Sequence, residues 1–267
     1  NNSGFALLGH LIETVTGKRY AEVLKDELLE PLGLNDSFLD AADVMTMRYV
    51  VGHSVSGEKA EVLRPWHLPR TVGPMGGLIT HVHDLLRYAR YHMGETSLAT
   101  KPIISATSIH AMQEQQVTVF GNEGWGLTWA LEQIAGVQAV SHTGGTNGQI
   151  TRLVLVPARS FAIAVFTNAG QGGALGKAVA DKAFELYLGI KRPEPTVAES
   201  SPDELEQYAG FYSNAFSEVE LTVLRGRLIG QFIYKRGFPT QDPPPSPPPP
   251  LVTFGVVKQP EGQAGSL

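Results

Sequence analysis

The chain has 267 residues and no cysteine. This absence excludes a disulfide scaffold, a thiolate metal site and a cysteine nucleophile. Basic side chains are also in the minority: 21 lysines and arginines stand against 26 aspartates and glutamates, which gives a net charge of −5. Because nucleic-acid-binding proteins usually present a basic face, the charge argues against a nucleic-acid partner.

Long apolar runs are lacking too. No stretch approaches the roughly 20 apolar residues that a membrane-spanning helix needs, so we expect no membrane span. Hydrophobic residues nevertheless make up 42% of the chain, which is enough for a packed core and argues against disorder. The sequence leaves the localisation open between a bacterial-type cytoplasm and export.

The chain as printed does not begin with methionine. It starts Asn1-Asn2-Ser3-Gly4 immediately before a strong helical pattern, and its last residues follow a strand-like run without closing an element. We therefore expect a fragment of a longer protein.

Apolar residues at helical spacing mark five segments. The first covers residues 4–16, and Gly17 is placed to end it. Pro31 and Gly33 would stop the second, and Thr80 could cap the third. The other four predicted helices are residues 20–30, 80–93, 105–115 and 173–188.

Runs rich in Val, Ile, Leu and aromatic residues predict strands in the second half of the domain. Two of them flank residues 157–160, which predicts a hairpin. Because these two runs are almost wholly apolar, we expect both faces of the hairpin to be covered, one of them by the helix at 173–188. The predicted strands are 125–132, 137–142, 150–157 and 161–168, with shorter candidates at 48–55 and 60–64.

Composition divides the chain into three parts. Residues 1–190 are expected to form one domain, residues 191–202 a linker, and residues 203–267 a small β domain with strands at 210–212, 219–223 and 228–233. The segment 242–250 holds seven of the 18 prolines. We expect a surface loop at 243–250 and, as the alternative, a ligand for a proline-binding domain.

The stretch that most suggests chemistry is residues 141–149, which holds one histidine and three glycines. Glycines on or beside a strand let a ligand or another backbone come close. His142 and Thr143 would then stand where a substrate could lie along a strand edge. A tight glycine turn with a hydrogen-bonded histidine is the alternative, and Asn2 taken alone could be no more than a helix cap.

Two further patterns are interpreted as coincidences. His81-Val82-His83 is similar to a His-x-His metal motif, but positions two apart on a helix point about 200° apart and cannot share one metal. We therefore predict no metal site. Ser56-Gly57-Glu58-Lys59 has the spacing Ser-x-x-Lys, yet it lies in a polar turn without the apolar flank that would desolvate the lysine.

Several short motifs follow one another in a characteristic order. They are Asn2-Ser3-Gly4-Phe5-Ala6-Leu7-Leu8-Gly9, Thr16-Gly17-Lys18, Glu30-Pro31-Leu32-Gly33-Leu34, Gly76-Gly77-Leu78-Ile79-Thr80, Gly124-Trp125-Gly126-Leu127, His142-Thr143-Gly144-Gly145-Thr146-Asn147-Gly148 and Phe166-Thr167-Asn168-Ala169. Over residues 1–190 the chain thereby resembles the serine β-lactamase-related superfamily, which includes class C β-lactamases, D-alanyl-D-alanine carboxypeptidases, D-aminopeptidases and family VIII carboxylesterases.

The resemblance implies an α+β fold, a β-lactamase/transpeptidase-like antiparallel sheet flanked by helices. Because the superfamily's N-terminal part is not in this chain, we expect the domain to be incomplete. The segment from Tyr208 to Tyr212 and the glycine-punctuated run after it are similar to a lipocalin-like barrel. About 65 residues are few for a closed eight-stranded barrel, so a small partial barrel is expected.

The resemblance also assigns roles to residues. His142-Thr143-Gly144 matches the third superfamily motif, in which His142 would orient the substrate or its leaving group. The N–H of Gly145 would be one of two oxyanion donors, and Asn2 would be the asparagine of a Tyr-x-Asn motif whose tyrosine precedes residue 1. Substrate contacts are further expected from Thr143, Gly144, Thr146 and Asn147. The Ser-x-x-Lys motif with the nucleophile would lie upstream.

We therefore expect part of a serine hydrolase that forms an acyl-enzyme with an ester, a D-amino-acid peptide or a β-lactam, without a cofactor. Its expected partners are a small-molecule or peptide substrate and the missing N-terminal segment as a separate chain. The alternative is a non-catalytic binding or interaction protein on the same scaffold; a metal-dependent hydrolase is a third, weaker one.

The first prediction concerns the isolated chain. It should not hydrolyse nitrocefin or p-nitrophenyl esters, because the nucleophile, its lysine and the tyrosine are missing. Activity that survives Ser56→Ala would mean a different nucleophile and contradict the motif alignment. Activity that Ser56→Ala abolishes would show that the local Ser-x-x-Lys is functional.

Overall fold

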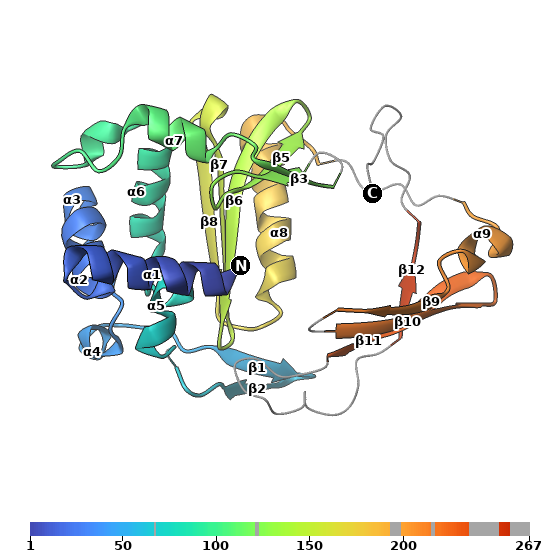
Figure 1. The fold of residues 1–267 in the computed structure, drawn as a ribbon. Helices are drawn as coiled ribbons and strands as arrows, with labels where there is room; N and C mark the ends of the chain where they lie inside the picture. The colour runs from blue at the N-terminus through green and yellow to red at the C-terminus, as the bar shows by residue number, and fades with distance from the viewer. Residues whose placement is uncertain (67, 121–122, 193–198, 215–216, 235–250, 257–267) are drawn as a thin grey trace. The chain divides into compact units, whose positions relative to one another are not determined.

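The computed structural model describes residues 1–66, 68–120, 123–192, 199–214, 217–234 and 251–256 (Figure 1). The chain divides into two compact units, Asn1–Arg192 and Pro193–Leu267, and each is described by itself. The expected proline-rich loop at 243–250 and residues 193–198 of the expected linker lie outside the described residues. Within the described part, no helix combines the length and the apolar character that crossing a membrane requires.

The first unit begins with α1 (Asn2–Thr16), which Gly17 ends in the left-handed conformation, as predicted. The cap is Asn1, whose side chain accepts a hydrogen bond from Ser3 N at 2.9 Å, so Asn2 is the first helical residue. A second helical segment is longer than predicted: α2 (Tyr20–Leu24), a π-helical turn (Lys25–Leu29) and α3 (Glu30–Leu32) are continuous. Pro31 does not stop this segment, and Gly33 with φ 69° does.

Short elements connect these helices to the sheet: α4 (Ala41–Val44), the hairpin β1 (His53–Ser56) and β2 (Lys59–Val62), α5 (Gly73–Gly76), α6 (Val82–His92) and α7 (Ala106–Met112). The prediction that Thr80 caps α6 is wrong. His81 is the residue before the helix, and Thr80 Oγ1 lies 2.7 Å from Ser37 Oγ instead.

A six-stranded antiparallel sheet forms the centre of the unit, in the order β3-β4-β5-β6-β7-β8. The predicted strand at 125–132 is two strands, because the chain turns at residues 126–129 with Thr128 at φ 73°. The strand predicted at 137–142 continues through the glycines to Thr146. The strands are β3 (Val117–Phe120), β4 (Glu123–Trp125), β5 (Ala130–Ile134), β6 (Val137–Thr146), β7 (Gln149–Val156) and β8 (Phe161–Thr167).

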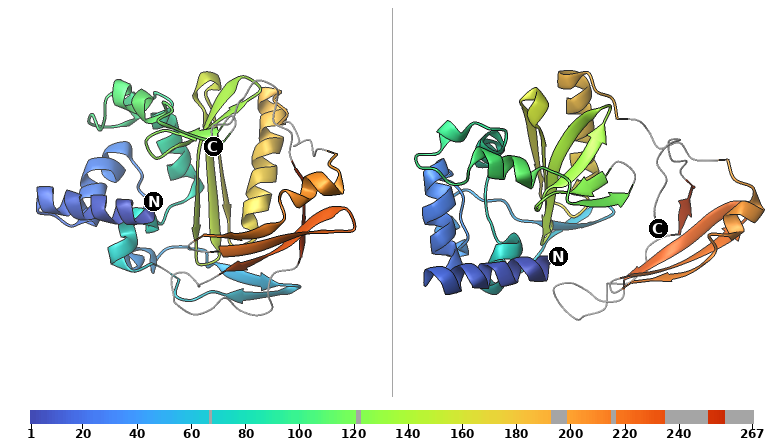
Figure 2. Two further views of the ribbon diagram at one scale, coloured as in Figure 1. Left: turned by 45° about the vertical axis from the view of Figure 1, so that its right-hand side comes forward. Right: turned by 45° about the horizontal axis from the view of Figure 1, so that its top comes forward.

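Helices cover both faces of the β6–β8 part of the sheet, as the apolar runs predict (Figures 1 and 2). On one face α6 packs through Ala89 against a core that contains Val140, Leu153 and Leu155. On the other face α8 (Gly172–Ala183) and the π-helical turn Phe184–Leu188 pack against Ala139, Val154 and Val156. Alternate residues of β7 therefore belong to different cores, which fixes its register.

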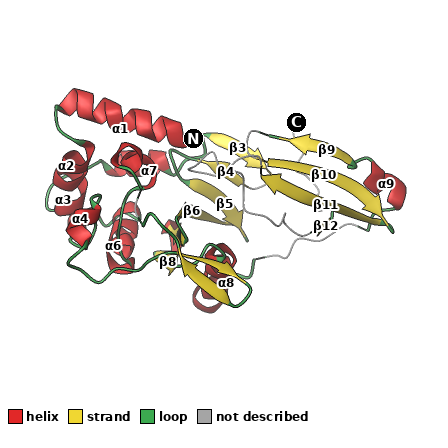
Figure 3. Ribbon diagram, turned by 90° about the horizontal axis from the view of Figure 1, so that it is seen from below, coloured by secondary structure: helices red, strands yellow, loops and turns green. Residues whose placement is uncertain are grey.

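The described part of the second unit is an open four-stranded antiparallel sheet in the order β12-β11-β10-β9 (Figure 3). The three predicted strands are present as β9 (Gly210–Ser213), β10 (Ser217–Leu224) and β11 (Arg227–Tyr234), and β12 (Val252–Phe254) joins them. A short helix, α9 (Pro202–Glu206), begins with a capping box between Ser201 and Glu204. The described strands form no closed barrel, and the lipocalin likeness stays a prediction.

A buried histidine on α6 makes the stability of the first unit sensitive to pH. His92 is 4% exposed, and its ring lies 4.4 Å from that of Tyr88 and 5.3 Å from that of Trp129, centroid to centroid. Burial disfavours the charged imidazolium and lowers the pKa of His92 from 6.5 to about 4. The folded state therefore holds His92 neutral.

Acid should destabilise the chain through His92. Between pH 6.5 and about 4, the unfolded chain binds a proton at this residue that the folded chain does not. Each pH unit in that window should then lower the free energy of unfolding by about 1.4 kcal/mol. Urea titrations from pH 7 to 4.5 measure how the free energy of unfolding changes with pH. This slope should be smaller for His92→Phe than for wild type, and the exposed control His10→Gln should keep the wild-type slope. Equal slopes in wild type and His92→Phe would contradict the assignment.

Candidate active site

The glycine-rich half of β6 has one free edge. Pairing between β5 and β6 ends at Ala130 opposite Ser141, whereas β7 pairs with β6 all the way to Thr146. Beyond Ser141, no described strand lies on the β5 side of β6. The predicted site residues His142, Thr143, Gly144 and Gly145 follow one another along this edge and are exposed.

The turn before β5 creates the gap. Gly126 N donates to Trp129 O at 2.8 Å, and Leu127 N donates to Met112 O at 3.0 Å. A Cβ on Gly126 would lie 2.3 Å from Met112 O, so only glycine fits there without a shift. The turn is thus fixed to the end of α7, and β5 cannot extend along the glycines of β6.

The backbone of Gly145 is directed toward the free edge. Thr167 Oγ1 donates to Ile150 O at 3.1 Å, so this carbonyl of β7 points toward β8 and away from β6. Ile150 stands opposite Gly145 in the ladder, and in an antiparallel pair the two residues of a non-hydrogen-bonded pair direct their N–H and C=O groups away from each other. The N–H of Gly145 is therefore available to a ligand beside the edge.

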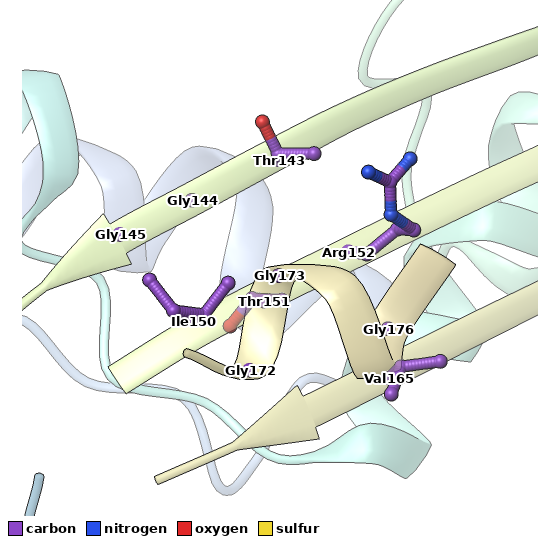
Figure 4. Close-up of a pocket in the computed structure, with 10 residues that line it drawn as sticks. All are labelled: Thr143, Gly144, Gly145, Ile150, Thr151, Arg152, Val165, Gly172, Gly173 and Gly176. Carbon is purple, nitrogen blue, oxygen red and sulfur yellow. The ribbon is translucent and has the colours of Figure 1, made fainter. Parts of the chain in front are cut away.

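Side-chain alternation separates two predicted site residues. Successive side chains of a strand point to opposite faces, so His142 and Thr143 project from different faces of the sheet. A cavity of about 360 Å³ lies on the Thr143 side, between β6, β7, β8 and the start of α8 (Figure 4). Its lining includes Thr143, Gly144 and Gly145, but not His142; the other lining residues are Ile150, Thr151, Arg152, Val165, Gly172, Gly173 and Gly176.

Arg152 is a cavity residue that the sequence interpretation missed. It stands opposite Thr143 in the β6–β7 ladder, and its guanidinium extends from β7 toward the strand that carries Thr143 (Figure 4). In the described part of the chain, this guanidinium has no hydrogen-bond or ion-pair partner. It could therefore pair with an anionic group of a ligand. Only the register of the hairpin reveals that Arg152 belongs beside the motif.

Trp125 belongs to the motif Gly124-Trp125-Gly126-Leu127, and the structure places it next to His142. The two rings are 6.2 Å apart, centroid to centroid, at an interplanar angle of 75°. This edge-to-face arrangement is favourable for aromatic rings. Both side chains remain open to solvent, with Trp125 42% exposed.

Thr146 and Asn147 lie where β6 turns into β7. Thr146 is exposed and pairs in register with Gln149. Asn147 Nδ2 donates to Pro65 O at 2.6 Å, and Gly148 O accepts from His53 N at 3.3 Å. The amide of Asn147 therefore anchors the turn to the segment that precedes α5.

Asn2 lies on α1 and not on the edge strand. It is exposed in the first turn, at the end of α1 that is nearer to the large sheet (Figures 1 and 2). α1 packs on α5, where a Cβ on Gly9 would overlap the ring of Pro74, and α5 in turn contacts β6. The helix is thereby placed beside the edge strand through α5.

The two patterns interpreted as coincidences have structural roles. Ser56 and Lys59 face each other across the exposed turn of the β1–β2 hairpin, as predicted, and not along a helix. His81 precedes α6, so the argument that both histidines lie on the helix is wrong. Its Nε2 lies 3.3 Å from Asp84 Oδ1, and the buried Asp84 accepts from Ser37 Oγ at 2.8 Å. Across the described residues, no three His, Asp or Glu side chains are placed to hold a metal ion.

Comparison with known proteins agrees with this architecture. The sequence matches the Beta-lactamase family over residues 1–188. Penicillin-binding protein 4 of Amycolatopsis lactamdurans is 29% identical over 221 residues, which cover 79% of this chain and 58% of that protein. Unguisins hydrolase ungD' of Aspergillus campestris is 25% identical over 179 residues, which cover 63% of this chain and 32% of that protein.

Among solved structures, the octameric penicillin-binding protein homologue from Pyrococcus abyssi superimposes with a TM-score of 0.64 at 24% identity, over 98% of this chain and 56% of that chain. The architecture is thus the α+β fold of β-lactamases and transpeptidases. The chain belongs to the beta-lactamase family. It spans 58% and 32% of the lengths of the two relatives named above.

Replacing two neighbouring glycines at the start of α8 tests how closely the cavity wall is packed. A Cβ on Gly172 would lie 1.7 Å from Thr167 Oγ1 and 2.5 Å from Thr167 Cβ, whereas a Cβ on Gly173 would meet nothing within 4 Å. Gly172→Ala should therefore lower the free energy of unfolding by about 1–3 kcal/mol. Gly173→Ala should leave it unchanged or raise it by up to about 1 kcal/mol. Urea unfolding measures the stability of the two variants. If their free energies of unfolding are equal, the close contact between Gly172 and Thr167 is contradicted.

Proposed function

We propose that this chain supplies the edge strand and one oxyanion donor of a serine hydrolase that works through an acyl-enzyme. The observation that carries the proposal is the free, glycine-rich edge of β6, along which the N–H of Gly145 points outward. Membership of the beta-lactamase family supports it. The nucleophilic serine would come from a segment of the longer protein that precedes Asn1, or from that segment as a separate chain.

The reaction has two halves. The serine hydroxyl gives up its proton while its oxygen forms a bond to the carbonyl carbon of an ester or amide, and negative charge develops on the carbonyl oxygen. The N–H of Gly145 stabilises this charge as one of two donors. The C–O or C–N bond then breaks, the leaving group takes up a proton, and the acyl group stays on the serine. Water attacks the acyl-enzyme and releases the carboxylic acid and the free serine.

The other site residues bind and orient the substrate in this proposal. His142 stands at the start of the free edge and orients the leaving group; when protonated, it favours a carboxylate. Asn2 binds the substrate amide. Thr143 and Thr146 contribute hydroxyl groups, and Gly144, which has no side chain, lets the substrate come close to the strand. Asn147 acts through the turn that its amide anchors to Pro65.

The proposed substrates are an ester, a D-amino-acid peptide or a β-lactam. A relative that is 29% identical is a penicillin-binding protein and one that is 25% identical is a hydrolase, which supports acyl transfer from such compounds. The guanidinium of Arg152, which has no partner among the described residues and lies beside Thr143, suits a substrate that carries a carboxylate.

Replacing Gly145 tests the oxyanion role in the full-length protein. Gly145→Pro removes the N–H, and proline is tolerated where the N–H faces the free side of a strand. We expect kcat/KM to fall about 10²–10³-fold, as for the loss of one oxyanion donor. Hydrolysis of nitrocefin, of a D-alanyl p-nitroanilide and of p-nitrophenyl acetate measures the effect and identifies the substrate class.

The matched control is Gly145→Ala, which keeps the N–H. Its Cβ would lie 3.2 Å from Ile150 Cδ1, the end of a flexible side chain, so activity should stay within a few-fold of wild type. Thermal unfolding of both variants separates loss of activity from loss of fold. If Gly145→Pro folds and hydrolyses its substrate at the wild-type rate, the oxyanion role is wrong. If the full-length wild type hydrolyses none of the three compounds, the proposed function is wrong.

A further inference from the structure

Trp125 lies at the end of the free edge of β6. The proposed reaction gives it no role. In the β4–β5–β6 ladders, Trp125 is opposite Ala130, and Ala130 is opposite Ser141. Trp125 is therefore in line with the last residue of β6 that β5 covers. The free edge begins with the next residue, His142, whose ring contacts Trp125 edge-to-face.

The distance along β6 between Gly145 and His142 determines which part of a ligand reaches the indole of Trp125. A strand rises about 3.3 Å per residue, so His142 lies about 10 Å along β6 from Gly145. A ligand chain whose carbonyl is bound at Gly145 and which runs along the edge toward His142 covers the first part of this distance with the backbone of its leaving residue and the rest with the side chain of that residue. It cannot continue as a strand, because Ala130 of β5 already occupies the next place beside Ser141. The ligand must end or turn against Trp125.

The surface at this point is apolar. Trp125 is 42% exposed, and its direct partner on β3, Val117, is 58% exposed. Leu127, in the turn after β4, is 51% exposed. An indole next to aliphatic side chains gains more from covering a ring than from covering a methyl group, since aromatic pairs add to the area they bury.

We propose that Trp125 is a specificity-determining residue that selects substrates with an aromatic group on the leaving-group side of the scissile bond. This inference rests on the proposed function, because His142 orients the leaving group there. The indole packs against the ring of the substrate beside His142 and takes no part in bond breaking. It therefore favours an aromatic leaving residue over a small one.

The kinetic test uses the full-length protein and two peptides that differ only in the leaving residue, acetyl-D-Ala-D-Phe and acetyl-D-Ala-D-Ala. Trp125→Ala should lower kcat/KM about tenfold for the D-Phe peptide and less than twofold for the D-Ala peptide. Leu186→Ala, which removes an exposed apolar side chain from the π-helical turn after α8, should leave the ratio of the two values unchanged. An equal loss on both peptides, or no loss on either, would overturn the inference.

A binding test uses the 267-residue chain and needs no catalysis. Titration with N-acetyl-D-phenylalanine should shift the indole N–H signal of Trp125 in an NMR spectrum, identified as the signal that Trp125→Ala lacks. The signals of Trp66, which donates to Val50 O, and of the buried Trp129 serve as internal controls and should stay in place. N-acetyl-D-alanine should shift none of them.

The two tests distinguish failure of the aromatic subsite at Trp125 from failure of the proposed function. If the full-length protein hydrolyses peptides but Trp125→Ala leaves the selectivity unchanged, the inference fails and the proposed function stands. If neither peptide is hydrolysed, nor any of the three compounds named above, the proposed function fails. A shift of the Trp125 signal by N-acetyl-D-phenylalanine would then still support the aromatic subsite, and the absence of that shift would overturn it.

Discussion

The turn at residues 126–129 is the constraint on which the candidate site depends. Gly126 lies so close to the carbonyl of Met112 that the chain is fixed to the end of α7, and β5 can begin only at Ala130. Among the described strands, none lies beside half of β6 on that side. A free strand edge invites pairing with another chain, and proteins usually block such edges. Here the edge carries glycines, which give a ligand close access to the backbone.

The strand behind this edge is held rigidly. β7 pairs with β6 on one side and with β8 on the other, and its side chains enter two separate cores, one under α6 and one under α8. A shift of one residue would move every apolar side chain of β7 to the wrong core. The register that places Ile150 opposite Gly145 is therefore fixed by packing far from the site, and with it the outward direction of the Gly145 N–H.

Local sequence patterns predict much of this fold. The helical spacing in α1, the apolar β7–β8 hairpin and the position of Gly17 all have short-range physical causes, and the structure contains them. Failures occur where a distant partner overrides local preference. Glycine disfavours strands, yet β6 continues through Gly144 and Gly145 because β7 offers a full set of partners. Pro31 does not end its helix, which continues to Leu32.

The candidate site likewise combines features with short-range causes and features that depend on distant parts of the chain. The local sequence is enough to predict which residues on β6 could meet a substrate, because glycines beside a histidine and a threonine are a short-range pattern that also resembles a known motif. The three-dimensional fold adds that His142 and Thr143 leave the strand on opposite faces. It also places Arg152 beside Thr143 and Trp125 beside His142, and it binds Asn147 to Pro65. These neighbours are far apart along the chain, and strand register and helix packing bring them together.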